Sequence, residues 1–511
     1  MTFTKPASAP KMFQVIWLAY CILIYLADSP SCQAQTPRQF QVTLSPTVVD
    51  RPISGRLYVF STNHQRRMPM HGPDWFRPEP FAAIEVTDLQ PGQSITIDDQ
   101  SNCFPTPIST WPDKSYRLQA VLDHDFDYPS PADGPGNFFS TVYHWQRADS
   151  ASIHLTLDQI VPEVNYTDTQ RVKFIQRPSQ LLADHFGHQV IDRVAVILPY
   201  SYLSQPDRRY PVHYEVTGFG GNLRSVAKQG PNPRLGNQEE VEMIKVILTG
   251  ECKNGHHVYA NSAANGPRGD VIVDEMIPHI DSHFRTIAQS DARFVGGHSS
   301  GGWSSLWLMV NYPDKFGAVF STSPDPVDFR NFQGTDLYAQ PPSSLYRDSA
   351  GKRRPLARRG QEVVLWYDDF CRMDQVLGRG GQMSSFDAVF SPLDDKGRPR
   401  RCWDATTGIV DSEVVAHWQQ YDISWLIQQR WEQLKDRLPG KIHLVMGELD
   451  TFYLEGAAHR LDQRLKQLGC DAQIQFLPDA SHNLPSWVFQ QQRQTMRGLF
   501  LRNFNTDGSR K

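Results

Sequence analysis

The chain carries one repeating hydrophobic pattern that restricts its fold more than any other feature. From about Val194 onward, near-continuous apolar runs of strand length alternate with amphipathic segments of helical spacing. Strands that are apolar on both faces belong to a sheet covered by helices on both sides, so the pattern predicts the α/β class with a mostly parallel sheet. The expected strands are 194–198, 211–217, 244–248, 293–295, 318–321, 442–446 and 474–477.

Two segments depart from this pattern. Residues 39–157 consist of short alternating runs separated by Pro, Gly and Asp clusters, which predicts a β-sandwich-like domain. Residues 329–438 are rich in Pro, Gly and Arg with one clear helical stretch near 414–431, which is typical of an insertion that forms a lid or a substrate wall. We therefore expect a β-rich domain at 36–165 and an α/β domain at 166–505 that carries the insertion.

The first 35 residues resemble an export signal. Lys5 and Lys11 precede an apolar run at 12–27, and Ala34 supplies a small residue at a cleavage site. The run is shorter than the roughly 20 residues needed to cross a bilayer. The expectation is a cleaved signal, a secreted or periplasmic protein, and no stable association with a membrane afterwards.

Charge and cysteine content narrow the possible partners. The formal net charge is −4 and the basic residues are interspersed with acidic ones, which argues against a nucleic-acid partner. Of the seven cysteines, Cys21 and Cys32 lie in the export signal and five remain, so at least one has no partner within the chain. Cys371 and Cys402 flank a Gly-rich stretch and form a candidate disulfide in an oxidising compartment.

The most informative local motif is Gly297-His298-Ser299-Ser300-Gly301. It follows an apolar strand and precedes a helical run, and this is the setting of a nucleophile elbow, in which a serine projects from a tight strand-to-helix turn. Glycines flank the serine because backbone atoms approach closely there. Ser299 is therefore the predicted nucleophile.

A serine hydroxyl needs a neighbouring base, and in this fold the order along the chain is serine, acid, histidine. His482 lies in a polar loop directly after the last expected strand, which is where the base belongs. The turn after strand 442–446 offers Asp450 as the acid, and Glu448 and Asp325 remain alternatives.

The Gly-rich loop Thr217-Gly218-Phe219-Gly220-Gly221 follows an early strand, so the backbone N–H groups of Phe219 and Ser300 are the expected oxyanion donors.

No metal and no cofactor are expected, because His279 and His283 lack the intervening Glu of a zinc protease helix. Asp123, Asp125 and Asp127 lack the Gly and Glu of a calcium loop, so they are interpreted as solvated turn carboxylates.

These residues give the chain a clear resemblance to the Putative esterase family of α/β-hydrolases, which includes feruloyl esterases, enterochelin esterases, S-formylglutathione hydrolases and mycolyltransferases. The resemblance rests on 209–212 leading into the glycine loop, on 265–267 ahead of 275–278, and on 297–302, and it covers roughly 194–500. It implies the α/β-hydrolase fold, and it implies that Ser299, Asp450 and His482 are nucleophile, acid and base. Family members often carry His-Gly where this chain has Thr217-Gly218.

The expected function is hydrolysis of a carboxylic ester, either small or linked to a polysaccharide, through a Ser-His-Asp triad and an acyl-enzyme. Two alternatives stay open: an acyltransferase of the same fold, and a binding protein that has lost catalysis. The N-terminal domain is expected to pack on the hydrolase unit or to shape its entrance, and Trp75 and Trp111 could stack on sugars.

Overall fold

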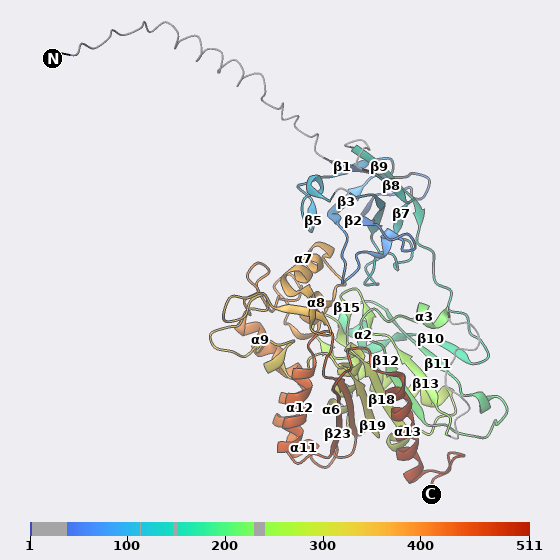
Figure 1. Ribbon diagram of the computed structural model, residues 1–511. Helices are drawn as coiled ribbons and strands as arrows, with labels where there is room; N and C mark the ends of the chain where they lie inside the picture. The colour runs from blue at the N-terminus through green and yellow to red at the C-terminus, as the bar shows by residue number, and fades with distance from the viewer. Residues whose placement is uncertain (3–37, 113, 147–151, 229–240) are drawn as a thin grey trace.

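The computed structural model describes residues 1–2, 38–112, 114–146, 152–228 and 241–511. The predicted export signal and its cleavage site lie outside these described residues, except for the first two positions. Within the described ranges, no helix combines the length and apolar character needed to cross a membrane. Figure 1 shows two sheets, one built from the N-terminal part of the chain and one from the remainder, with helices around the second.

The N-terminal part forms a single nine-stranded sheet in the order β4-β1-β9-β7-β6-β2-β3-β5, with β8 paired to β6. Along the chain β4 directly follows β3, but in the sheet β4 pairs with β1, at the opposite end from β3. The sheet therefore curls on itself around an apolar core. The expected sandwich is thus one continuous sheet, because β9 pairs with both β1 and β7. Its strands are β1 (Gln39–Leu44), β2 (Ile53–Thr62), β3 (Phe81–Leu89), β4 (Ser94–Ile97), β5 (Asn102–Phe104), β6 (Tyr116–Asp123), β7 (Phe138–Ser140), β8 (Tyr143–Trp145) and β9 (Ser152–Ile160).

The second sheet has eight strands in the order β10-β11-β13-β12-β18-β19-β22-β23. All seven strands expected from the sequence are present, but the sheet is mixed: β11 runs antiparallel to β10 and β13, and the pairs from β13 to β23 are parallel. The edge strand β10 was not predicted, because it is half polar and contains a proline. The strands are β10 (Val172–Ser179), β11 (Val190–Ile197), β12 (Val212–Val216), β13 (Ile244–Leu248), β18 (Arg293–His298), β19 (Ala318–Thr322), β22 (Ile442–Gly447) and β23 (Ala472–Leu477).

Helices cover both faces of this sheet. One face packs on α6 (Ser300–Asn311), on α12 (Glu455–Gln467) and on the helical segment formed by α4 (Arg268–Asp270), the π-helical turn 271–276 and α5 (Ile277–His283). The other face packs on α13 (Ser486–Asn503) through Phe294, Phe320 and Phe500. The short helices α2 (Gln180–Phe186) and α3 (Leu223–Ala227) begin at the side-chain caps Ser179 and Asn222.

The segment between β19 and β22 contains more regular structure than the single helix we expected. It holds a hairpin and five helices, and the expected helix near 414–431 is divided at Asp422, whose side chain caps a new helix. Short helices separated by Gly-rich turns carry too few periodic residues to be recognised from sequence. The elements are β20 (Pro355–Arg359), β21 (Glu362–Trp366), α7 (Tyr367–Leu377), α8 (Gln382–Phe390), α9 (Ser412–Trp418), α10 (Ile423–Gln429) and α11 (Trp431–Leu434).

The predicted disulfide between Cys371 and Cys402 is absent. Both side chains are buried and free, as are those of Cys252 and Cys470 among the described residues, while Cys103 is free and partly buried. Cys371 and Cys402 both belong to the apolar core that surrounds the insertion. They therefore pack there as small apolar residues rather than forming a covalent link.

The two sheets are joined through the insertion. Almost every side chain of β2 is buried, because alternate residues face different cores: Leu57 and Val59 face the N-terminal core, and Tyr58 and Phe60 face the core shared with the insertion. Helix α7 ends against this second face, where the hydroxyl of Tyr58 donates to the carbonyl of Leu377 at 2.7 Å. An apolar contact of this kind holds the two parts in a definite arrangement.

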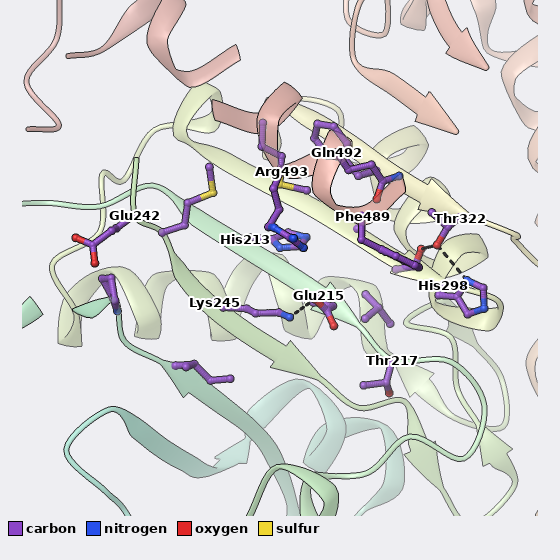
Figure 2. Close-up of a pocket in the computed structure, with 18 of the residues that line it drawn as sticks. His213, Glu215, Thr217, Glu242, Lys245, His298, Thr322, Phe489, Gln492 and Arg493 are labelled. Carbon is purple, nitrogen blue, oxygen red and sulfur yellow. Dashed lines mark hydrogen bonds and ion pairs between the residues drawn. The ribbon is translucent and has the colours of Figure 1, made fainter. Parts of the chain in front are cut away.

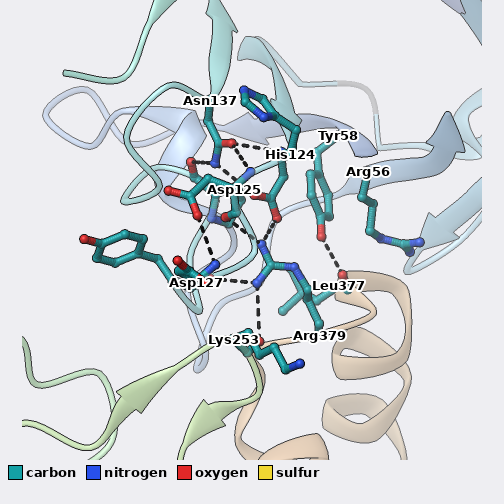
Figure 3. Close-up of polar contacts among 12 residues, drawn as sticks. Arg56, Tyr58, His124, Asp125, Asp127, Asn137, Lys253, Leu377 and Arg379 are labelled. Atoms are coloured by element: carbon teal, nitrogen blue, oxygen red, sulfur yellow. Dashed lines mark hydrogen bonds and ion pairs between the residues drawn. The ribbon is translucent and has the colours of Figure 1, made fainter. Parts of the chain in front are cut away.

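A buried ion pair strengthens this junction, and it corrects our interpretation of Asp123. Arg379 pairs with the Asp123 carboxylate, which is 0% exposed and accepts a second hydrogen bond from Asn137 at 2.8 Å. The guanidinium also donates to the carbonyls of Tyr128 at 2.7 Å and Lys253 at 3.3 Å (Figure 3). Asp123 is therefore a structural anchor between the two parts, not a solvated turn residue.

Candidate active site

Ser299 occupies the turn between β18 and α6 with a strained backbone. Its φ of 60° and ψ of −127° lie where non-glycine residues are rarely found. A Cβ on Gly297 would collide with the backbone of Gly301, and one on Gly301 would collide with the carbonyl oxygen of Val216. Glycine at both positions is therefore what permits this turn.

Backbone hydrogen bonds hold the turn in place. The Ser299 amide donates to the carbonyl of Thr322 at 3.0 Å, and the Ser299 carbonyl accepts from the Trp303 amide at 3.1 Å. The Ser299 side chain is partly exposed and makes no hydrogen bond to any described residue. The hydroxyl therefore has no hydrogen-bond partner within the described chain, and catalytic hydrogen bonds are often formed only when substrate is bound.

His482 and Asp450 form a direct pair. His482 follows β23, Asp450 follows β22, and His482 Nδ1 lies 2.8 Å from Asp450 Oδ2. The Asp450 carboxylate is 0% exposed, and its other oxygen accepts from the Phe452 amide at 2.8 Å. A buried carboxylate bonded to one ring nitrogen directs the second ring nitrogen away from it. The hydroxyl of Ser323 donates to the His482 carbonyl at 3.0 Å and holds the loop.

The two alternative acids have other partners. Glu448 bonds to His459 Nε2 at 3.0 Å, and neither group contacts His482. Asp325 accepts the hydroxyl of Ser300 at 2.6 Å, and burial raises the pKa of its carboxyl to about 6. Asp450 is therefore the only one of the three expected acids that is hydrogen-bonded to His482.

The glycine loop after β12 lies against the serine turn. A Cβ on Gly218 would stand 3.4 Å from the Ser299 Cβ and 3.1 Å from the His298 carbonyl oxygen. His256 holds the loop, because its ring lies 3.0 Å from the Thr217 carbonyl oxygen, and burial lowers the pKa of His256 to about 4. The sequence has Thr217 where relatives often carry histidine, and here a distant histidine contacts this position.

His298 is a member of the site that sequence reasoning did not select. Its ring centroid lies 4.7 Å from that of His482, and its Nδ1 lies 3.1 Å from the Thr322 hydroxyl. Burial, and then the neighbouring His482, lower the pKa of His298 to about 4, so it is uncharged at neutral pH. Its position beside the nucleophile in the motif was the available signal.

The N-terminal sheet also contributes to the site. The ring centroid of Trp75 lies 5.3 Å from that of Phe219 and 5.2 Å from that of Phe370 in the insertion. Phe219 is the residue expected to supply an oxyanion donor. The next residue, Phe76, lies 6.1 Å from Phe452, whose ring packs edge-on against His482 at 5.0 Å. Two consecutive aromatics in an otherwise polar, proline-rich loop were the signal for this contact.

A cavity of about 620 Å³ lies on the other side of the sheet, between the strands and α13. It is lined by His213, Glu215 and Lys245 from the sheet and by Phe489 and Arg493 from α13 (Figure 2). At one end its lining includes Gly218, Gly297 and His298, next to the serine turn. Residues 229–240, which precede β13, lie outside the described residues.

The site gathers at the carboxyl edge of the sheet, where Ser299, Asp450, His482 and the glycine loop each follow a strand. A mixed sheet between two helical layers, with a serine turn after a central strand and a His-Asp pair after the last two, defines an α/β-hydrolase. The chain belongs to the Putative esterase family, whose model matches residues 192–491. It is accordingly an ester-hydrolysing enzyme.

Individual proteins are similar to parts of this chain. An endo-1,4-beta-xylanase/feruloyl esterase of Xylanibacter ruminicola is 31% identical over 137 residues, which cover 24% of this chain and only 18% of that protein. A ferulic acid esterase structure is 15% identical, with a TM-score of 0.36, over 65% of this chain and 99% of that one. An S-formylglutathione hydrolase from Agrobacterium tumefaciens is 12% identical, with a TM-score of 0.38, over 65% and 95%.

Proposed function

We propose that the protein is a secreted serine carboxylic-ester hydrolase that works through an acyl-enzyme. The observation that carries this proposal is the hydrogen bond of 2.8 Å between His482 and the fully buried Asp450, beside a strained turn that exposes the Ser299 hydroxyl. A base oriented by a buried acid next to an exposed serine is the arrangement that acyl transfer requires.

In the proposed reaction, Ser299 Oγ attacks the ester carbonyl and His482 Nε2 takes its proton. The backbone N–H groups of Phe219 and Ser300 hold the oxyanion, because both lie beside the serine turn. The alcohol leaves with the proton from His482, and water activated by the same base then releases the acid. Asp450 keeps the proton of neutral His482 on Nδ1 and stabilises the charged ring.

The aromatic side chains around the oxyanion loop favour a planar, apolar acyl group. Trp75 packs against Phe370 and against Phe219 of the glycine loop, and flat rings stack well on such a cluster. A relative of part of this chain carries feruloyl esterase in its name. A hydroxycinnamoyl ester is therefore the acyl donor that we propose, and the apolar run at 12–27 supports secretion.

The nucleophile is tested with p-nitrophenyl acetate and with a feruloyl ester. Ser299→Ala should lower kcat by at least about a thousandfold on both, since loss of a nucleophile removes the covalent route. Ser282→Ala is the matched control, because this hydroxyl lies on α5 and contacts only backbone and a helix histidine. Equal rates for wild type and Ser299→Ala would refute the proposal.

The acid is tested separately. Asp450→Asn should lower kcat by about 10³-fold or more, because the asparagine amide favours the wrong tautomer of His482. Glu448→Gln removes a carboxylate from the same turn that bonds only to His459, and it should leave kcat within about threefold of wild type. A larger loss in Glu448→Gln than in Asp450→Asn would overturn the assignment.

A further inference from the structure

A second cavity lies between the N-terminal sheet and the insertion, with a volume of about 840 Å³. The connection between β2 and β3 forms one wall and Arg359 of β20 closes the cavity from the insertion. The other wall consists of Pro105, Pro112, Lys114 and Tyr116. None of the groups proposed to carry out the reaction lines it, so it needs an explanation of its own.

The cavity adjoins the base side of the active site. Phe76 lines it and packs on Phe452, which packs on His482. Arg359 is also close to the Asp450 turn. The amide of the preceding residue, Arg358, donates to the carbonyl of Thr451 at 2.8 Å, and Thr451 directly follows Asp450. In acyl transfer the alcohol departs from the side of the base that protonates it. The cavity therefore lies where the alcohol part of an ester would extend.

The lining has a surplus of positive charge. Arg67 is paired with Asp74 at 3.5 Å, and Glu79 accepts from the Thr62 hydroxyl at 2.9 Å. The side chains of Arg77 and Arg359 have neither an ion pair nor a hydrogen bond with any residue that the structure describes. Two unpaired guanidinium groups at one cavity favour a carboxylate, which they can bind in a bidentate manner.

Flat, apolar surfaces accompany these charges. Phe76, Pro78, Pro80 and Tyr116 line the cavity. Aromatic and proline rings offer faces on which the apolar side of a sugar ring can stack. This combination suits an acidic sugar better than a lipid or a neutral chain.

We propose that the alcohol half of the substrate is an acidic saccharide, bearing uronate carboxylates, and that it binds in this cavity between the two parts of the chain. The proposal rests on the function proposed above, because it needs His482 to be the base. It makes the N-terminal sheet part of the substrate site rather than an appended module.

The test measures binding to full-length Ser299→Ala by calorimetry, with trigalacturonate and neutral xylotriose as probes. Trigalacturonate should bind about tenfold more tightly than xylotriose at low salt, and the difference should shrink at about 0.5 M salt because exposed charges are screened. Arg77→Gln and Arg359→Gln should each weaken trigalacturonate by about two- to fivefold and leave xylotriose unchanged. Phe76→Ala should weaken both.

Arg398→Gln is the matched control, because Arg398 is an exposed arginine of the insertion that pairs only with Asp394. Equal affinity for the two probes, or an equal loss in Arg398→Gln, would overturn the proposal. Binding does not depend on catalysis, and turnover of p-nitrophenyl acetate by the same arginine substitutions in the protein that retains Ser299 reports the chemistry independently. Failure of the saccharide site is thus distinguishable from failure of the esterase assignment.

Discussion

Replacing Asp325 with asparagine should stabilise the protein at neutral pH. The carboxyl is buried beside the active site, and burial raises its pKa from 3.8 to about 6. The folded state therefore holds this proton more tightly than the unfolded state does. One pKa unit corresponds to about 1.4 kcal/mol, so the unfolding free energy contributed by Asp325 should fall by about 3 kcal/mol in total as the pH rises from about 3 to above 6.

Asparagine stays neutral throughout this range and can still accept the hydrogen bond of Ser300. The difference in unfolding free energy, Asp325→Asn minus wild type, should therefore become more positive by about 2.5 kcal/mol between pH 4 and pH 7. Urea unfolding at a series of pH values measures it. Asp127→Asn, at an exposed aspartate, is the control and should give a flat difference. A flat difference for Asp325→Asn as well would refute the reasoning.

Three further predictions concern the junction, the serine turn and the aromatic wall. Arg379→Ala should lower the unfolding free energy by about 3–5 kcal/mol in urea titration, because it leaves the buried carboxylate of Asp123 unpaired, and adding Asp123→Asn should recover most of the loss. Gly301→Ala should lower kcat by about 100-fold, since its Cβ would displace the strand end beside the oxyanion loop; unchanged kcat would contradict this. Trp75→Ala should lower kcat/KM about tenfold more for a feruloyl ester than for p-nitrophenyl acetate, whereas the distant control Trp431→Ala should affect both equally.

Much of the α/β part could be predicted from the sequence because its signals are local. A strand buried on both faces must be apolar along its length, and all seven expected strands are present for this reason. The helix that ends before Gly469 is also present, with the glycine at a φ of 70°. The turn at Ser299 depends on glycines two residues away on each side, so its strain was foreseeable from five consecutive residues.

Contacts between distant segments could not be derived in this way. The sequence left three candidate acids, and only distances in the folded chain separate Asp450 from Glu448 and Asp325. Asp123 looks like a turn residue until Arg379, 256 positions later, reaches it. The single curled N-terminal sheet and the helices of the insertion depend likewise on pairings that no local pattern encodes.

The amino-acid sequence by itself determined the class of fold, the positions of seven strands along the chain and the serine turn, since each follows from hydrophobic periodicity and steric limits within a few residues. Only the tertiary structure decided which carboxylate meets His482 and that Trp75 and Phe76 reach the site from another sheet. The reason is physical: such contacts arise from the packing of segments far apart in the chain, and their energies depend on distance and burial rather than on neighbouring residues.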